Sequence, residues 1–311
     1  MAKTTFSAML AAVPDNFEQL RKATVFPLLA SFKLDGIRGI NRFIPNIGCK
    51  LVSRSDISLP SAFAQRVFGV GEYCDMDGEL IAQPERFGNI YKDSFSAVMT
   101  HGAENQLKWY VFDIVRNDPL KFGDRIDLLH KRYANVGDEN WELIEQKWIH
   151  TWDELLEYEN KALDLGYEGL ILRHPDGPYK FGRSTLKQFW MAKMVRIAIE
   201  EVEITGFYEG LHNGNEAIVD SRGYTTRSSH QEFMVGKGLV GGFNVRDVKH
   251  GWEFKIGVAD GLDIATREKI WKGEISVIGK ISRYKYKPYG MDAVPRHPVL
   301  LWGQWRNHID M

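Results

Sequence analysis

Short stretches of the first two thirds of the chain are apolar or alternate between apolar and polar residues. Such stretches are typical of β-strands, which bury one or both faces. They are bounded by turn-forming residues, as at Asp35-Gly36. The predicted strands lie within residues 24–34, 49–55, 108–115 and 168–173.

Helical spacing is clearest in residues 151–166, where leucines recur on one face and Gly166 follows as a predicted C-cap. Near the N-terminus, Asp15 followed by Glu18 predicts a capped helix. The acidic residues there argue against a secretion signal.

The pattern changes near residue 197, where short strands begin to follow one another at regular spacing. This spacing is typical of a small β-barrel or sandwich. We therefore expect an α+β chain with two domains, residues 1–196 and residues 197–311. The later strands are expected within residues 197–210, 241–248, 251–258 and 274–286.

Composition agrees with a folded two-domain protein. The chain has 311 residues, of which 44% are hydrophobic and 26% charged, so it can bury a core. Its two cysteines, Cys49 and Cys74, are too few for a disulfide framework or a structural zinc site. They fit a reducing compartment, so we expect a cytoplasmic protein. No apolar run approaches the roughly 20 residues of a membrane span.

Charge is unevenly distributed although the net charge is only −1. Residues 1–179 carry 20 Lys and Arg against 26 Asp and Glu, whereas residues 180–311 carry 20 against 15. The excess of cations in the second part indicates either a basic face for nucleic acid or an ordinary uneven surface.

Lys33 stands at the end of an apolar run, in a hexapeptide of the form K-x-D-G-x-R. A free lysine has a pKa of about 10.4, but burial and a nearby cation can lower it. The neutral amine can then attack phosphorus and form a covalent phosphoramidate. Asp35 would orient that lysine, and Arg38 would offer a planar fork to a phosphate. The hexapeptide alone leaves open a solvated lysine at a strand end.

Further stretches add groups that suit a nucleotide. Tyr110 and Phe112 share one face of a predicted strand, and one of them can stack on a base. Each such residue also has an ordinary structural interpretation, but their order along the chain favours the functional one. The other candidates are Arg54, Glu79, Glu168, Lys180, Arg183, Lys187 and Lys193.

The ordered series K-x-D-G-x-R, S-R, D-G-E, Y-x-F-D and E-G, followed by a basic element, resembles the covalent nucleotidyltransferases. It is most similar to the short ATP-dependent DNA ligases of bacteriophages and large DNA viruses. The stretches "PDGPYKFGRSTLK" and "RHPVLLWGQWR" strengthen the resemblance, which covers nearly the whole chain. It implies an adenylation (nucleotidyltransferase) domain of antiparallel sheets with helices, followed by an OB-fold β-barrel.

The resemblance implies a role for each matching residue. Lys33 would become adenylated, and Phe112 would stack on adenine. Glu79 would bind the ribose hydroxyl or help to hold metal, and Glu168 would be associated with metal. The implied ribose, phosphate and nucleotide ligands are Arg38, Arg54, Arg183 and Lys193.

Two positions depart from the family pattern. A second lysine usually follows the first at the end of the adenylation domain, whereas this chain reads Lys193-Met194-Val195-Arg196. Arg196 is a possible replacement. The family often has a glutamate two positions before the nucleophile, where this chain has Ser31.

The implied activity is sealing of nicks in duplex DNA, as needed in replication, repair and recombination. ATP and Mg²⁺ are the implied cofactors, with a lysyl-AMP and then a DNA-adenylate as intermediates. We expect a monomer that binds nicked double-stranded DNA without sequence specificity and without a membrane. A capping-type guanylyltransferase or RNA ligase is the alternative enzyme. A non-enzymatic OB-fold protein would carry no covalent nucleotide.

The long polar segment of residues 211–250 is rich in glycine and contains Arg222, Arg227 and Lys237. It predicts either loops that contact the DNA backbone or an ordinary strand pair with a solvated turn.

Overall fold

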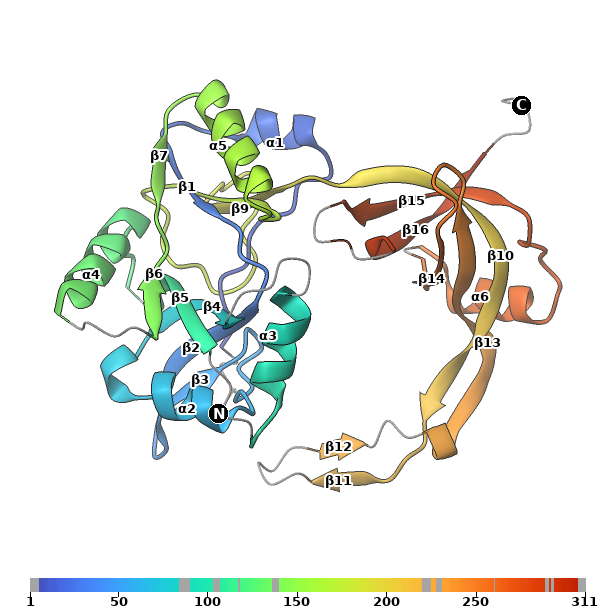
Figure 1. Ribbon diagram of the computed structural model, residues 1–311, viewed down its shortest axis with the longest axis horizontal. Coiled ribbons are helices and arrows are strands. Elements are labelled where there is room, and N and C mark those ends of the chain that lie inside the picture. The colour runs from blue at the N-terminus through green and yellow to red at the C-terminus, as the bar shows by residue number, and fades with distance from the viewer. Residues whose placement is uncertain are drawn as a thin grey trace. The chain divides into compact units, whose positions relative to one another are not determined.

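A computed structural model describes most of the chain and divides it into two compact units, Met1–Arg196 and Ile197–Met311. Each unit is described by itself (Figure 1). The described residues are 6–83, 90–102, 107–116, 118–135, 140–219, 225–227, 231–259, 261–288, 291 and 294–306.

Unit 1 contains two sheets. The first has the strand order β7-β1-β8-β9, and the second has the order β3-β2-β4-β5-β6. All neighbouring strands are antiparallel except β5 and β6, which are parallel. The first sheet consists of β1 (Leu28–Phe32), β7 (Lys147–Ile149), β8 (Gly169–Arg173) and β9 (Met191–Val195). The second consists of β2 (Ile37–Ile44), β3 (Gly48–Val52), β4 (Met76–Ala82), β5 (Leu107–Ile114) and β6 (Trp141–Leu143).

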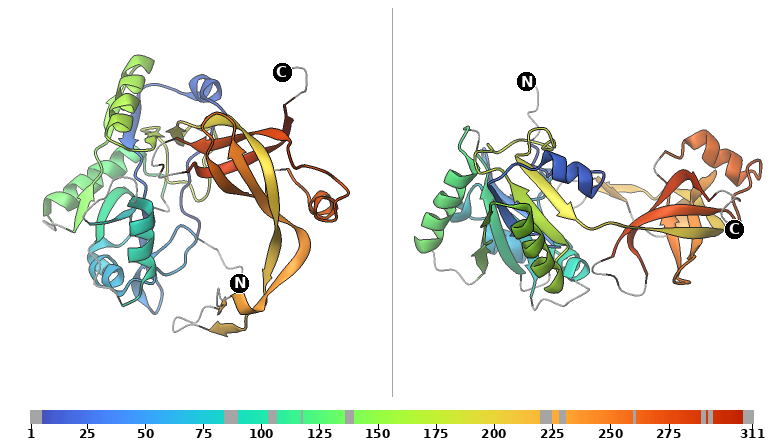
Figure 2. Two further views of the ribbon diagram at one scale, coloured as in Figure 1. Left: turned by 45° about the vertical axis from the view of Figure 1, so that its right-hand side comes forward. Right: turned by 90° about the horizontal axis from the view of Figure 1, so that it is seen from above.

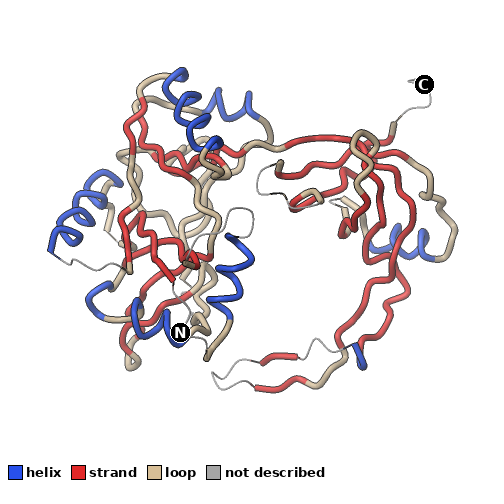
Figure 3. Tube along the Cα trace, viewed as in Figure 1, coloured by secondary structure: helices blue, strands red, loops and turns tan. Residues whose placement is uncertain are grey.

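Helices flank these sheets (Figure 3). The predicted helix in residues 151–166 is confirmed: the Thr151 hydroxyl caps it, and Gly166 ends it with a φ of 84°. The predicted cap at Asp15 is wrong by one residue, because the Asn16 side chain accepts from the Gln19 amide. The helices are α1 (Phe17–Ala23), α2 (Ala62–Phe68), the short 3-10 turn η1 (Gly71–Tyr73), α3 (Ile90–Met99), α4 (Phe122–Asn135) and α5 (Trp152–Asp164).

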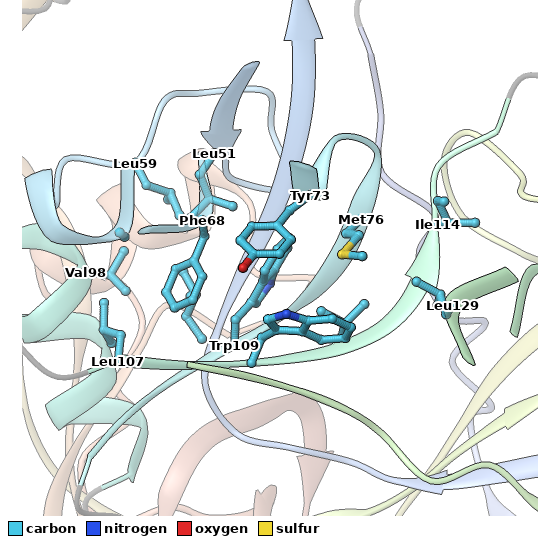
Figure 4. Close-up of a cluster of buried hydrophobic side chains, with 14 of the residues drawn as sticks. Leu51, Leu59, Phe68, Tyr73, Met76, Val98, Leu107, Trp109, Ile114 and Leu129 are labelled. Carbon is cyan, nitrogen blue, oxygen red and sulfur yellow. The ribbon is translucent and has the colours of Figure 1, made fainter. Parts of the chain in front are cut away.

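Alternation along β5 divides its side chains between a core and a cavity. Trp109 is fully buried against the aromatic residues Phe68 and Tyr73, as Figure 4 shows. Val111 is fully buried in the same cluster. Phe112 points to the opposite face, because successive side chains of a strand alternate. The second sheet therefore presents Phe112 away from its own core.

The first sheet is divided in the same way. Leu28 and Ala30 of β1 and Leu170 of β8 pack under α5 in a second core. The alternate residues of β1, Ser31 and then Lys33 beyond its end, face away from that core. Each sheet of unit 1 thus buries one face and gives the other to a shared cavity.

Unit 2 is built on a five-stranded sheet with the order β14-β13-β10-β15-β16. The long strands β10 and β13 run side by side and curve together (Figure 2). Within the described residues, no ladder joins β14 to β16, so the predicted barrel is seen as an open sheet. The elements are β10 (Ala198–Asn213), β13 (Met234–Asp247), β14 (Glu253–Gly257), α6 (Ile264–Trp271), β15 (Ile281–Lys287) and β16 (Arg296–Trp305).

A small ribbon of β11 (Ala217–Val219) and β12 (Thr225–Arg227) connects β10 to the 3-10 turn η2 (Gln231–Phe233) before β13. Arg227 donates to the Asn215 carbonyl, and Lys237 is exposed on β13. Arg222 lies outside the described residues. Among those residues, every helix is too short or too polar to cross a bilayer.

Replacing Gly169 by alanine should destabilise unit 1 by at least about 2 kcal/mol. Its φ is 139°, and an added Cβ would lie 2.1 Å from the Met194 carbonyl oxygen. Chemical denaturation followed by tryptophan fluorescence measures the effect. Gly71→Ala is the matched control, because a Cβ there meets nothing within 4 Å. Equal losses in the two variants would show that the close approach at Gly169 does not matter.

Candidate active site

A cavity of about 540 Å³ lies within unit 1 and is lined by residues of both sheets. It collects most of the site residues predicted from the sequence. Glu168 joins them through its ion pair with Lys33, and Asp35 lies in the adjoining turn. The predicted residues that line the cavity are Lys33, Arg38, Arg54, Glu79, Phe112, Arg183 and Lys193.

Pairing between β1 and β8 positions the two central residues. The Lys33 amide donates to the Gly169 carbonyl at 2.9 Å, directly beyond the paired part of the strands. Lys33 Nζ lies 2.5 Å from Glu168 Oε2. The Glu168 side chain is only 4% exposed, whereas that of Lys33 is 23% exposed. The lysine is therefore held by a buried carboxylate but can still be reached from the cavity.

Arg38 is fixed by several partners at once. Its Nε and Nη2 donate to the two oxygens of buried Asp77, at 2.7 and 2.5 Å. Its Nη1 donates to the Met9 carbonyl at 2.9 Å, and the Tyr179 hydroxyl donates to Asp77 at 2.8 Å. Burial disfavours the charge on Arg38, but Asp77 outweighs this effect and raises the pKa of Arg38. Arg38 is thus a fixed positive charge in the cavity wall.

Phe112 is supported from the same side. The Arg38 guanidinium lies 5.0 Å from the centre of its ring. Such a contact between a cation and an aromatic face restricts the ring and leaves its other face for a ligand. Phe112 therefore provides a flat apolar surface suited to a base.

A buried triad of charges is centred on Asp113, the residue that follows Phe112. Asp113 accepts from Arg125 Nε at 2.7 Å and also from Arg173, and all three side chains are almost fully buried. Burial would raise the pKa of Asp113, but the two guanidinium groups keep it below its usual range. Arg173 also lines the cavity. The triad ties β5, α4 and β8 together at the back of the site.

Glu79 has an unusual protonation equilibrium. Burial raises the pKa of Glu79 to about 7, with Asp35 and Asp77 adding to the effect while Lys33 and Arg38 oppose it. In the protein alone, this carboxyl is therefore near its midpoint at neutral pH. A bound cation would favour its charged form.

The N-terminal segment forms one wall of the cavity. Leu10 forms a parallel bridge with Arg183, and the Ala12 carbonyl accepts from the Lys193 amide at 3.1 Å. Arg183 Nη1 donates to the Ala11 carbonyl at 2.7 Å. Arg183 and Arg54 are otherwise exposed cations at the cavity.

Arg196 does not line this cavity among the described residues. Its guanidinium pairs with both oxygens of Glu159, which is fully buried, and lies 4.8 Å from the centre of the Phe17 ring. Arg196 thus anchors the last residue of unit 1, and its replacement of the second lysine stays a prediction.

Several residues of the site were missed in the sequence. Asp77 holds the cavity residue Arg38 and lies two residues before Glu79 on β4, so the two acids share one face of the strand. That spacing could have identified Asp77. No sequence pattern around Gln146 identifies it as a cavity residue. In the sequence it lies between β6 of one sheet and β7 of the other. Tyr91, Phe95 and Met99 follow one another at helical spacing on α3 and line the cavity, although all three are exposed.

The arrangement suits a nucleotide that reacts at phosphorus. Cations surround Lys33, an aromatic ring offers a stacking surface, and two carboxylates lie close to the lysine. Covalent catalysis of phosphoryl transfer requires a nucleophile, charge neutralisation and positioning, and the cavity provides groups for each.

Comparison with known proteins agrees with this geometry. Residues 8–193 match the family model of the ATP dependent DNA ligase domain. A DNA ligase of Haemophilus influenzae is 27% identical over 214 residues, which cover 67% of this chain and 72% of that protein. Chlorella virus DNA ligase-adenylate is 27% identical in sequence, and its structure covers 97% of this chain and 100% of its own, with a TM-score of 0.53. A Lig E DNA ligase has the same fold at 19% identity, with a TM-score of 0.65 and coverage of 96% and 99%. The chain therefore belongs to the family of ATP-dependent DNA ligases.

Proposed function

We propose that this protein seals nicks in duplex DNA and that Lys33 carries AMP between ATP and the DNA end. The observation that carries the proposal is the contact between Lys33 and Glu168 in a cavity lined by cations. A lysine on an open surface would have no such partner and no binding space beside it.

The proposed first step forms a bond between Lys33 Nζ and the α-phosphorus of ATP, and pyrophosphate leaves. The ammonium must lose a proton before its nitrogen can attack. Glu168 Oε2, at 2.5 Å, is the acceptor in contact with that nitrogen. AMP then moves to the 5′-phosphate at the nick, and the neighbouring 3′-hydroxyl displaces it. The backbone is closed and AMP is released.

The other cavity residues have supporting roles in this proposal. Phe112 stacks on the base, and the fixed charge of Arg38 lies beside it. In the part of the chain that the structure describes, the Arg183 guanidinium is held only by the neutral Ala11 carbonyl, so a phosphate can replace that partner. Arg54 and Lys193 add positive charge for the phosphates and ribose. Asp35 orients Lys33 from the adjoining turn.

The carboxylates fit Mg²⁺ in the way that phosphoryl-transfer enzymes use it. Mg²⁺ is usually bound by one or two carboxylates together with substrate phosphates and water. In the described part of the chain, no cluster of three or more acidic, histidine or cysteine residues forms a ready metal cage. Glu79 and Glu168 therefore suit a metal that arrives with ATP. When bound, Mg²⁺ would neutralise charge on the phosphates.

We also propose that unit 2 is an OB-fold domain that holds the duplex. Its sheet order, β14-β13-β10-β15-β16, with α6 between β14 and β15, is the order of a five-stranded Greek-key barrel opened between β14 and β16. Contacts to DNA would be mainly to phosphates and independent of sequence.

Lys33→Ala should abolish covalent nucleotide on the denatured protein and nick sealing together. Lys33→Arg should do the same, because a guanidinium stays protonated. Mass measurement after incubation with Mg²⁺ and ATP checks the first effect, and gel-based sealing of a nicked duplex checks the second. GTP in place of ATP should leave the wild-type mass unchanged. An alanine variant that still gains the mass of AMP would refute the assignment of Lys33.

Glu168→Gln should slow nucleotide transfer to Lys33 by about 100-fold or more and change the free energy of unfolding much less. The amide keeps the shape of the side chain but loses the charge that contacts Lys33. The rate is measured in a single turnover across a Mg²⁺ titration. Glu157→Gln, on the exposed face of α5, is the control. A Glu168→Gln rate equal to that of the control would remove Glu168 from the mechanism.

Stability should depend on pH through Glu79. Because the folded protein raises the pKa of Glu79 from 4.5 to about 7, it binds this proton more tightly than the unfolded chain does. The resulting stabilisation is complete below pH 4.5 and is lost as the pH rises through about 7. Urea unfolding from pH 5 to 8 in a metal chelator should therefore show wild type losing stability relative to Glu79→Gln. Parallel curves would mean that Glu79 does not titrate in this range.

A further inference from the structure

The side-chain oxygen Oε1 of Gln146 is buried and has no hydrogen-bond partner among the described residues. The residue lines the cavity that contains Lys33. An unpartnered buried acceptor destabilises a folded protein by about 1–3 kcal/mol, so such atoms are rare. Where one is found, its presence needs a physical explanation. A ligand in the cavity that donates a hydrogen bond would supply the missing partner.

Strand register places Gln146 relative to the nucleophile. β1 and β7 pair Leu29 with Trp148 and Ala30 with Lys147. One further step in this register sets Gln146 opposite Ser31. Both residues then lie on the same face of the sheet, because directly opposed residues share a face.

The same register continues across the sheet. Ser31 pairs with Ile171, and Ile171 pairs with Lys193. Gln146, Ser31, Ile171 and Lys193 thus form one row, and all four line the cavity. Ser31 is only 4% exposed, so its hydroxyl is also largely shielded from solvent.

Lys33 is two residues beyond Ser31 on β1, which is roughly 6.6 Å along a strand. In a nucleotide attached to Lys33, the ribose separates the α-phosphorus from the base by a comparable distance. A base at this row would touch apolar Ile171 and Ile144, and Phe112 would approach it from the other sheet. Its polar edge would then meet the Gln146 amide.

We propose that Gln146 Oε1 accepts a hydrogen bond from the 6-amino group of adenine and that Gln146 is a specificity-determining residue for nucleotide transfer to Lys33. This inference rests on the proposed function. Adenine offers a donor at position 6, where guanine offers an acceptor that would face Oε1 unfavourably. The Ser31 hydroxyl can donate or accept, so by itself it distinguishes the two bases less.

The proposed hydrogen bond can be tested with a thermodynamic cycle in which the side chain and the 6-amino group are removed separately and together. Gln146→Met keeps the length of the side chain and removes its polar atoms. Purine riboside 5′-triphosphate keeps the ring, ribose and phosphates of ATP and lacks the 6-amino group. For each protein and each triphosphate, mass measurement gives kcat/KM for formation of the covalent nucleotide.

With ATP, Gln146→Met should lower kcat/KM about tenfold, the value of one hydrogen bond of about 1.4 kcal/mol in a dry site. With purine riboside triphosphate, wild type and variant should react at equal rates. The ratio of ATP to GTP use should also fall in the variant. Gln188→Met, at an exposed glutamine that does not line the cavity, should leave all these values unchanged.

Thermal unfolding separates this role from a structural one. Loss of an unpartnered buried oxygen should leave the Tm of the nucleotide-free variant unchanged or higher. An equal loss of kcat/KM with both triphosphates, or a lower Tm that accounts for it, would overturn the assignment of Gln146. A wild-type protein that takes no nucleotide onto Lys33 would instead overturn the proposed function, and this assignment with it.

Discussion

The pairing of β1 with β8 is the constraint on which the site depends. It sets the Lys33 amide against the Gly169 carbonyl and brings Nζ to Glu168, the residue before Gly169. The side-chain period of a strand is two, so a slip of one residue would turn Lys33 toward the core that holds Leu28 and Ala30. The close approach of Met194 to Gly169 helps to exclude such a slip, since β8 is fixed on both sides. The apolar face of the sheet thus fixes the position of Lys33 on the other face.

Buried charges around the cavity are matched in pairs and triads. Asp77 holds Arg38, and Asp113 holds Arg125 and Arg173. Removing one partner of a buried pair leaves an uncompensated charge, so each group constrains its neighbours. The Arg38–Asp77 pair ties β2 to β4 within one sheet, whereas the Asp113–Arg173 pair joins that sheet to β8 of the other. Lys33 and Arg183 differ from them, because they are partly accessible and can exchange their present partners for phosphate oxygens. The buried, paired charges form the cavity wall, and the accessible charges of Lys33 and Arg183 face the cavity.

Local patterns in the sequence predicted much of this molecule. The strands at residues 28–32 and 107–114 and the helix at 152–164 follow from alternation, helical spacing and a glycine stop. The ordered motifs also selected residues that the fold brings into one cavity, although their roles stay predictions.

Long-range partners were not predictable from the sequence. Tyr179 lies 102 residues from Asp77. Gln146 comes opposite Ser31 only when the register of β1 and β7, two strands far apart in the chain, is extended by one residue. The cap of α1 was missed for a smaller reason, since Asn16 and Asp15 both suit that position.

Two polar groups of the cavity wall lower the stability of the fold. Gln146 Oε1 has no hydrogen-bond partner within the described residues, and burial opposes the charge of Glu79. Each cost would vanish if an apolar residue replaced the polar one, so stability alone does not explain why these groups are there. A nucleotide that donates to one group, and a cation that favours the charge of the other, would relieve both costs at once. Binding of such a ligand then stabilises the fold, because the new contacts satisfy groups that the protein alone leaves unfavourable. On this view, polar groups that lower the stability of the protein alone favour its ligand.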